Sequence, residues 1–149
     1  MDYQIEIITG DGDPRRSVAF LISENKRVTA KNAFNGLDKT AERTLRHRFD
    51  MWVSNQPGRH RYHGWNSSQF SGRYVNCFVF KCGKNNQERF YGFLCKPKEK
   101  NQLYEICVLV VHIRKKKDET KESDLKDVKA LSDNLAVRAT IKNFFKEKP

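Results

Sequence analysis

The chain has 149 residues, of which 38% are hydrophobic, and carries a net charge of +11. Its mean hydropathy is −0.80, and no apolar run approaches the roughly 20 residues that a bilayer-spanning helix needs, so the sequence excludes such a helix. The length favours a single domain, residues 1–149, with a substantial hydrophobic core. The acidic N-terminus lacks the pattern of a signal peptide, so we expect a cytoplasmic protein.

Positive charge is concentrated in the middle of the chain. Residues 29–76 carry 8 basic and 3 acidic side chains, and residues 77–117 carry 10 and 3, whereas residues 118–149 carry 7 of each. A focused positive field favours a polyanionic partner, most often a nucleic acid. A basic surface without a specific partner is the alternative.

The N-terminal quarter predicts one strand and two short helices. Tyr3–Thr9 is β-rich and alternates polar with apolar residues, which is typical of a strand, and Gly10–Pro14 predicts a turn. Ser17–Lys26 favours a short helix with its apolar residues on one face. Thr29–Phe34 predicts a second helix.

The clearest helical pattern covers residues 38–54. Asp38 suits the N-cap position, and apolar residues then recur at helical spacing along one stripe. The stripe consists of Leu37, Ala41, Leu45, Phe49, Trp52 and Val53. We expect this helix to cover the sheet with Trp52 in the core, and to end before Pro57-Gly58.

A short segment, Arg59–Trp65, interleaves basic with aromatic residues (RHRYHGW). Such a segment suits contact with phosphates and stacking on unpaired bases. The alternative is an ordinary basic loop whose Trp65 packs into the core. The following residues, Asn66–Arg73, predict a loop or turn.

Three β-rich runs predict the sheet: Cys77–Cys82, Arg89–Leu94 and Tyr104–Ile113. The loops between them are short and rich in turn residues, so we expect consecutive antiparallel strands. The last run is almost wholly apolar, which indicates a central strand covered on both faces. Beyond residue 117 the pattern predicts one or two helices, with a break near Ser132–Asn134. The predicted fold is α+β: a small twisted antiparallel sheet packed on an N-terminal helical pair, with a C-terminal helix.

The four cysteines are Cys77, Cys82, Cys95 and Cys107. They form no CxxC pair and fall in or beside predicted strands, which indicates buried reduced thiols. A zinc site that combines them with His60 and His63 is the alternative.

Phosphate chemistry in this chain would have to proceed without a metal or cofactor. There is no P-loop or dinucleotide fingerprint, and no pair of carboxylates for Mg²⁺ in the basic region. RNA permits such a reaction, because its own 2′-hydroxyl attacks the adjacent phosphate while the protein moves protons and stabilises charge. The candidate catalytic residues are Arg89, His112, Tyr91, Lys81 and Lys115. We expect Arg89 and His112 on the same sheet face, within reach of one phosphate.

Further basic residues are candidates for binding RNA. They are Arg46, Arg59, Arg61, Arg73, Lys116 and Lys117.

Several segments resemble the RelE/ParE toxin superfamily, and most closely its HigB-like branch. Arg89–Phe93 resembles that family's strand of an Arg followed by apolar and aromatic residues, and Val108–Lys117 resembles its final strand and basic exit. Asp118–Leu131 resembles the turn and helix that follow, and Phe70–Arg73 lies where the family has a short loop. The resemblance covers residues 40–145. Cys77–Lys81 departs from the family by lacking the Glu that often precedes the basic residue.

The resemblance implies a type II toxin–antitoxin toxin with a RelE-like fold. Such a toxin is a ribosome-dependent, metal-independent mRNA endonuclease that inhibits translation, and a helix-turn-helix antitoxin neutralises it. Its partners would be mRNA, the ribosome and that antitoxin. Two alternatives stay open: a non-enzymatic inhibitor on the same fold, like the gyrase-targeting branch, and a basic nucleic-acid-binding accessory protein.

Overall fold

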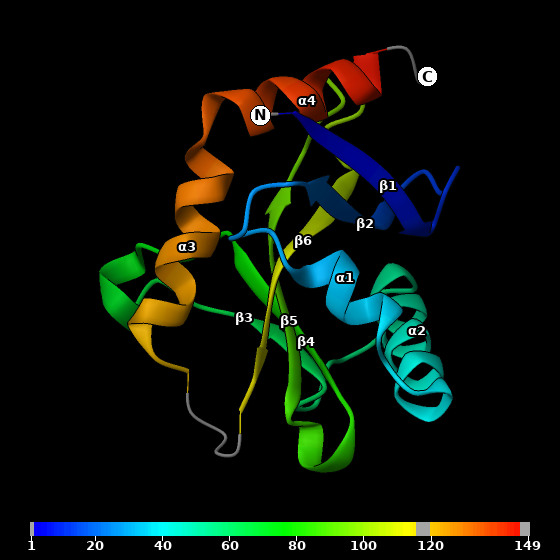
Figure 1. Cartoon of the computed structure of the whole chain (residues 1–149). Coiled ribbons are helices and arrows are strands. Elements are labelled where there is room, and N and C mark those ends of the chain that lie inside the picture. The colour runs from blue at the N-terminus through cyan, green and yellow to red at the C-terminus, as the bar shows by residue number, and fades with distance from the viewer. Residues whose placement is uncertain (1, 116–119, 147–149) are drawn as a thin grey trace.

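The computed structural model describes residues 2–115 and 120–146, and in this part of the chain a six-stranded sheet lies between two pairs of helices (Figure 1). The strands are β1 Tyr3–Thr9, β2 Arg16–Ser23, β3 Tyr62–Gly64, β4 Cys77–Cys82, β5 Glu88–Cys95 and β6 Glu105–Arg114. The helices are α1 Ala30–Asn35, α2 Lys39–Val53, α3 Glu122–Asp133 and α4 Leu135–Lys146, with short 3₁₀ turns at Gln69–Gly72 and Lys84–Asn86.

The sheet is mixed, not purely antiparallel as expected. Its strand order is β1-β2-β6-β5-β4-β3, and β2 pairs with β6 in parallel while the other pairs are antiparallel. The two parallel strands are joined by a long crossover that contains α1, α2 and three strands, which is what parallel pairing requires. The α+β class and the central position of β6 are confirmed.

The predicted helix over Ser17–Lys26 is wrong, because this segment forms β2. Residues 17–21 are almost fully buried: Val18 and Phe20 face one core and Ala19 and Leu21 face the other. A strand covered on both faces loses the polar–apolar alternation of a half-exposed strand, so its apolar run is indistinguishable from a buried helix.

On one face of the sheet lie α1 and α2. The Oδ1 atom of Asp38 accepts a hydrogen bond from the N–H of Ala41 at 2.8 Å, so Asp38 is the predicted N-cap. Trp52 is 3% exposed, and its ring packs against Phe78 and Phe80. The predicted cover of the sheet by this helix is confirmed.

On the opposite face lie α3 and α4, which turn apart at Asn134. Asn134 has extended backbone, and its Oδ1 accepts from the N–H of Val137 at 3.0 Å, which starts the second helix. The predicted break between two C-terminal helices is therefore present. The two helices bury apolar side chains against the sheet: Leu125, Val128, Leu131, Val137, Ile141 and Phe145.

A bulge interrupts the pairing of β5 with β6. Tyr91 lies opposite Val111, but the next residue along β5, Gly92, lies opposite Leu109, so Val110 is an extra residue in β6. Val110 and Val111 both belong to the core under α3 and α4. A Cβ at Gly92 would lie 2.3 Å from the carbonyl oxygen of Val108, so only glycine fits this close approach.

Candidate functional site at strands β5 and β6

Arg89 and His112 lie on opposite faces of the sheet, contrary to the sequence-based expectation. Because of the bulge, His112 lies opposite Phe90, and its ring packs against Phe90 with 4.9 Å between the ring centroids, on the face covered by α1 and α2. Arg89 alternates with Phe90 and lies on the face covered by α3. The two side chains cannot contact the same phosphate in this arrangement.

Three other predicted catalytic residues do share one face. Lys81 on β4 lies directly opposite Arg89 on β5, and Tyr91 lies one step further along β5 on the same side. Lys81, Arg89 and Tyr91 are 4%, 2% and 0% exposed, so all three are buried on the sheet face on which α3 lies. The sheet therefore brings two cations and a phenol together under one helix.

Lys115 and Asp124 complete this group, which we call the cation cluster: Lys81, Arg89, Tyr91, Lys115 and Asp124. Lys115 forms an ion pair with Asp124 in the first turn of α3. Burial raises the pKa of Tyr91, and the nearby negative charge of Asp124 raises it further, against smaller opposing effects of Arg89 and Thr120. Tyr91 is thus a neutral phenol at physiological pH and suits the donation of a proton more than its acceptance.

Side-chain contacts of Glu122 hold the first turn of α3 beside the cation cluster. Glu122 accepts a hydrogen bond from the Tyr74 hydroxyl at 2.7 Å and forms an ion pair with Arg73 at 3.1 Å. Burial raises the pKa of Tyr74, and the hydrogen bond to Glu122 adds to this effect, so the phenol stays a donor. Together with the Lys115–Asp124 pair, these contacts hold the start of α3 against the sheet.

On the opposite face, His112 and Arg114 both bind Glu88. Oε1 of Glu88 lies 2.9 Å from Nε2 of His112, and Oε2 accepts from Nε of Arg114 at 2.5 Å. Burial alone would raise the pKa of Glu88, but the hydrogen bonds from Arg114 and His112 and their charges outweigh it, so the pKa is lowered. The Nε2 edge of His112 is occupied by this carboxylate, and the ring's role here is to hold Glu88.

The predicted RNA-binding residues are scattered over the molecule. Arg46 lies on α2 and pairs with Glu42 at 3.1 Å, whereas Arg73 lies on the other side of the sheet beside α3. Arg59 is exposed in the loop after α2, and Arg61 donates from Nε to the carbonyl oxygen of Gly58 at 3.2 Å. Lys116 and Lys117 lie outside the described residues.

The aromatic residues of Arg59–Trp65 are not available for stacking on bases. Tyr62 and Trp65 are 4% and 6% exposed, and the Trp65 ring stacks on Tyr91 with 6.2 Å between the centroids. Tyr62, in β3, packs against Phe78 and Phe80. The alternative interpretation, in which Trp65 belongs to the core, is confirmed.

The cysteines are free thiols, and Cys77, Cys82 and Cys107 are buried as predicted, while Cys95 is partly exposed. Burial raises the pKa of Cys77 and of Cys82 to about 12, so neither is poised as a nucleophile. Among the described residues, no three His, Cys, Asp or Glu side chains come close enough to hold a metal ion.

Sequence reasoning missed Asp124, the carboxylate of the cation cluster. Its Oδ2 also accepts from the backbone N–H of Lys121 at 3.0 Å, which fixes the start of α3. Asp124 could have been predicted from its position. It lies in the first turn of a helix that follows a basic strand end, where an acidic residue caps the helix and can pair with the preceding cations.

Comparison with protein-family models, with curated proteins and with solved structures finds no match to this chain. Within residues 2–115 and 120–146, no helix combines the length and the apolar character needed to cross a membrane.

Proposed function

We propose that this protein is a metal-independent endoribonuclease that acts at the cation cluster. The observation that supports this most directly is the shared sheet face of Lys81, Arg89 and Tyr91, with Lys115 and Asp124 completing the group. Buried charges of this kind are costly and concentrate at functional sites. His112 takes no part in the proposed reaction, because Glu88 holds it on the other face.

The cluster contains the groups that cleavage by the RNA's own 2′-hydroxyl requires. The guanidinium of Arg89 offers a planar fork to the phosphate, and Lys81 and Lys115 add positive charge. Tyr91 is neutral and donates a proton to the departing 5′-oxygen, while the carboxylate of Asp124 accepts the proton of the 2′-hydroxyl. Each proton thereby has a defined source and destination.

RNA reaches this cluster only when the first turn of α3 moves away from the sheet. Lys81 and Arg89 are at most 4% exposed while Glu122 binds Tyr74 and Arg73. Among the described residues, the contacts that hold this turn include the Tyr74–Glu122 hydrogen bond, the exposed Arg73–Glu122 ion pair and the largely buried Lys115–Asp124 ion pair. The proposed enzyme is therefore closed in the state described: the first turn of α3 opens to admit RNA and then returns, so that Asp124 meets the 2′-hydroxyl of the bound strand.

The resemblance to RelE/ParE toxins suggests the biological role of the proposed nuclease. We propose a toxin of a type II toxin–antitoxin system that cleaves mRNA on the ribosome and is neutralised by a helix-turn-helix antitoxin. The α+β fold with a helical pair on one sheet face is compatible with this assignment. A nucleic-acid-binding protein without catalysis is the second candidate, and the net charge of +11 favours it because a positive field attracts a polyanion without any reaction.

Replacement of Arg89 tests the proposal. Arg89→Lys keeps the charge and loses the planar fork, so we expect mRNA cleavage on ribosomes to fall about 10²- to 10³-fold. Mapping of mRNA 5′ ends after induced expression measures the cleavage, and a thermal melt shows whether the variant is folded. The matched control is His112→Gln, which should cleave normally.

Two results would contradict the proposal. A folded Arg89→Lys protein that cleaves like the wild type would remove Arg89 from the reaction. Intact mRNA in cells that express the wild-type protein would favour the non-catalytic candidate.

A further inference from the structure

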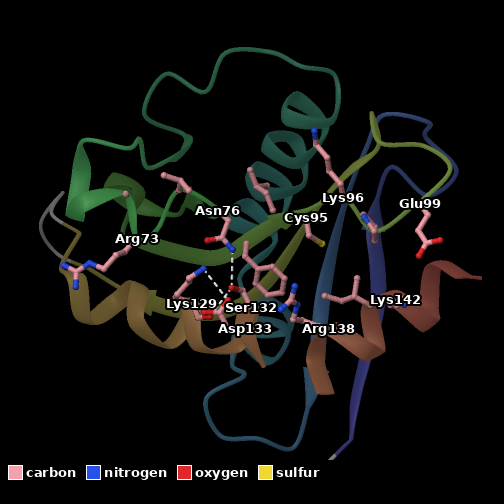
Figure 2. Close-up of a pocket in the computed structure, with 16 residues that line it drawn as sticks. Arg73, Asn76, Cys95, Lys96, Glu99, Lys129, Ser132, Asp133, Arg138 and Lys142 are labelled. Atoms are coloured by element: carbon pink, nitrogen blue, oxygen red, sulfur yellow. Dashed lines mark hydrogen bonds and ion pairs between the residues drawn. The ribbon is translucent and has the colours of Figure 1, made fainter. Parts of the chain in front are cut away.

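A groove opens at the far end of α3 from the cation cluster. It has a volume of about 670 Å³ and lies between the end of α3, one side of α4, the segment before β4 and the end of β5 (Figure 2). Asp124 and Asp133 are nine residues apart on α3, which corresponds to about 14 Å along the helix. None of the cation-cluster residues lines the groove, so it is a separate feature of the molecule.

Basic side chains dominate the lining of the groove. They are Arg73, Lys96, Lys129, Arg138 and Lys142, against the two carboxylates of Glu99 and Asp133. Lys129 is paired with Asp133 at 3.3 Å and Arg73 with Glu122. The other three cations are exposed, and within residues 2–115 and 120–146 they form no ion pair. A groove with three such cations is suited to an anionic ligand.

Two of these three cations lie on the same helix, α4. Arg138 and Lys142 are four residues apart on α4, so their side chains project from the same helix face toward the groove. Lys96 comes from the segment after β5, at the other side of the groove in Figure 2. A phosphate between them would meet positive charge from two sides.

The groove also has apolar walls. Val75, Phe93 and Ile141 line it; Val75 is 53% exposed, whereas Phe93 and Ile141 are 3% and 5% exposed and form its floor. A purely ionic ligand, such as a free phosphate, would leave these walls in contact with water. A ligand with a flat apolar part would cover them.

One hydrogen-bond acceptor in the wall lacks a donor. The Ser132 hydroxyl donates to the carbonyl oxygen of Lys129 at 3.0 Å, so it accepts from Nδ2 of Asn76 at 3.2 Å. This orients the Asn76 amide and leaves its Oδ1 buried, with no hydrogen-bond donor among the described residues. A buried acceptor without a partner is unfavourable, and a ligand N–H in the groove would supply one.

We infer that this groove binds a nucleotide. Lys96, Arg138 and Lys142 would hold the phosphate, and the base would cover Phe93 and Ile141 while an exocyclic N–H approaches Asn76 Oδ1. The volume lies in the range of about 300–1,000 Å³ that is typical of small-molecule sites. The nucleotide is either free or part of a single-stranded RNA. The inference does not rest on the proposed cleavage, because it uses other residues and requires no reaction.

A binding assay with a probe that cannot be cleaved tests this inference. The probe is a fluorescein-labelled 2′-O-methyl trinucleotide, which lacks the attacking 2′-hydroxyl, so its binding is independent of any nuclease activity. Arg138→Glu together with Lys142→Glu should weaken binding at physiological salt by at least about tenfold. Both side chains are exposed, so the variant should fold.

The matched control reverses two charges elsewhere. Lys39 and Arg43 are exposed, are also four residues apart, and lie on α2 on the opposite sheet face. Lys39→Glu with Arg43→Glu changes the net charge by the same amount and should weaken binding by less than about threefold. Equal losses in the two double variants would overturn the inference in favour of a diffuse electrostatic field.

Competition experiments identify the source of the nucleotide. If adenosine 5′-monophosphate displaces the probe at concentrations similar to those of an unlabelled trinucleotide, the groove takes a free nucleotide; if only the trinucleotide does so, it takes RNA. Both results support the inference. Displacement by pentaglutamate as effective as that by the trinucleotide would overturn it, because the groove would then be a site for an acidic peptide.

Discussion

The two faces of β5 use charged residues in different ways. On the face covered by α1 and α2, Glu88 is bound by His112 and by Arg114, whose side chain is 73% exposed. On the face covered by α3, Lys81 and Arg89 are at most 4% exposed, beside Tyr91. Alternation along one strand thus separates a partly solvated ion group from a buried one.

The difference shows which group calls for a functional explanation. Glu88 lies at the end of β5, and the arginine that binds it keeps most of its side chain in contact with water. Two cations buried on a sheet face lose their hydration, and apolar residues of the same size would often give equal or greater stability. We therefore place the proposed chemistry at Arg89 and not at His112, although the histidine is the more familiar proton-transfer group.

Of the substitutions that test this comparison, Gly92→Ala should have the largest effect on stability. The added Cβ would lie 2.3 Å from the Val108 carbonyl oxygen and 2.9 Å from Leu109 Cα, so β5 and β6 would have to separate at the bulge. We expect the free energy of unfolding to fall by about 3 kcal/mol. Urea denaturation measures it.

Gly36→Ala is the control for that substitution. A Cβ at Gly36 would come no closer than 3.6 Å to any atom, and the backbone there is right-handed, so its stability should change by less than about 1 kcal/mol. If Gly92→Ala lowers the free energy of unfolding as little as this control does, the close approach of β5 and β6 is not required for the bulge that places His112 and Arg89 on different faces.

Glu88→Gln sharpens the comparison on the α2 side. The variant keeps the shape of the side chain but loses its charge, and we expect it to reduce stability at pH 7 by about 1–3 kcal/mol. Folding lowers the pKa of Glu88, so its ionised form stabilises the fold above the ordinary value of about 4.3 and this stabilisation is lost as the pH falls through the lower folded value.

Urea denaturation at pH 7 and pH 3 measures this dependence. The gap between the wild type and Glu88→Gln should narrow at the lower pH, whereas Glu99→Gln, a change at an exposed carboxylate, should show little effect at either. A gap that is equal at both pH values would mean that the charge of Glu88 is not what binds His112 and Arg114.

Arg46→Gln should have the smallest effect. The Arg46 side chain is 46% exposed; it pairs with Glu42 one turn away on α2 and lies over the Phe34 ring at 5.1 Å, so its removal should change stability by less than about 1 kcal/mol. We also expect RNA binding to change by less than about threefold, because Arg46 lies on the face away from the cation cluster and the groove. A tenfold loss of RNA affinity would instead make the α2 face the RNA-binding surface.

Elements with a local pattern were predictable from the sequence. The strand Cys77–Cys82 has the predicted bounds, and α2 has the predicted N-cap at Asp38, because turn residues and helical spacing are encoded within a few positions. β2 was not predictable as a strand, since burial on both faces removed its alternation. Its parallel pairing with β6 depends on the path of more than eighty residues between the two strands.

The candidate site was only partly predictable for a related reason. Lys81, Arg89 and Tyr91 share a face because simple alternation holds along β4 and β5. Simple alternation fails for His112 because of the bulge in β6. The bulge lies within four apolar residues, Val108–Val111, and an apolar residue can pack on either face, so the sequence does not show where the alternation breaks. The groove is formed by side chains from α3, α4 and the sheet, and no stretch of sequence contains its pattern.

The bulge at Val110 also decides which side of the protein the last residues of β6 serve. If the pairing continued regularly from Gly92 and Leu109, Val110 would lie opposite Tyr91 and His112 opposite Arg89, among the buried cations. A homologue that lacks one residue at this point would pair regularly and still place its histidine opposite Phe90. In an alignment of such chains, a single-residue gap here would therefore leave the histidine in its supporting position, whereas a chain of unchanged length without the bulge would move the same VHIRK motif to the other face.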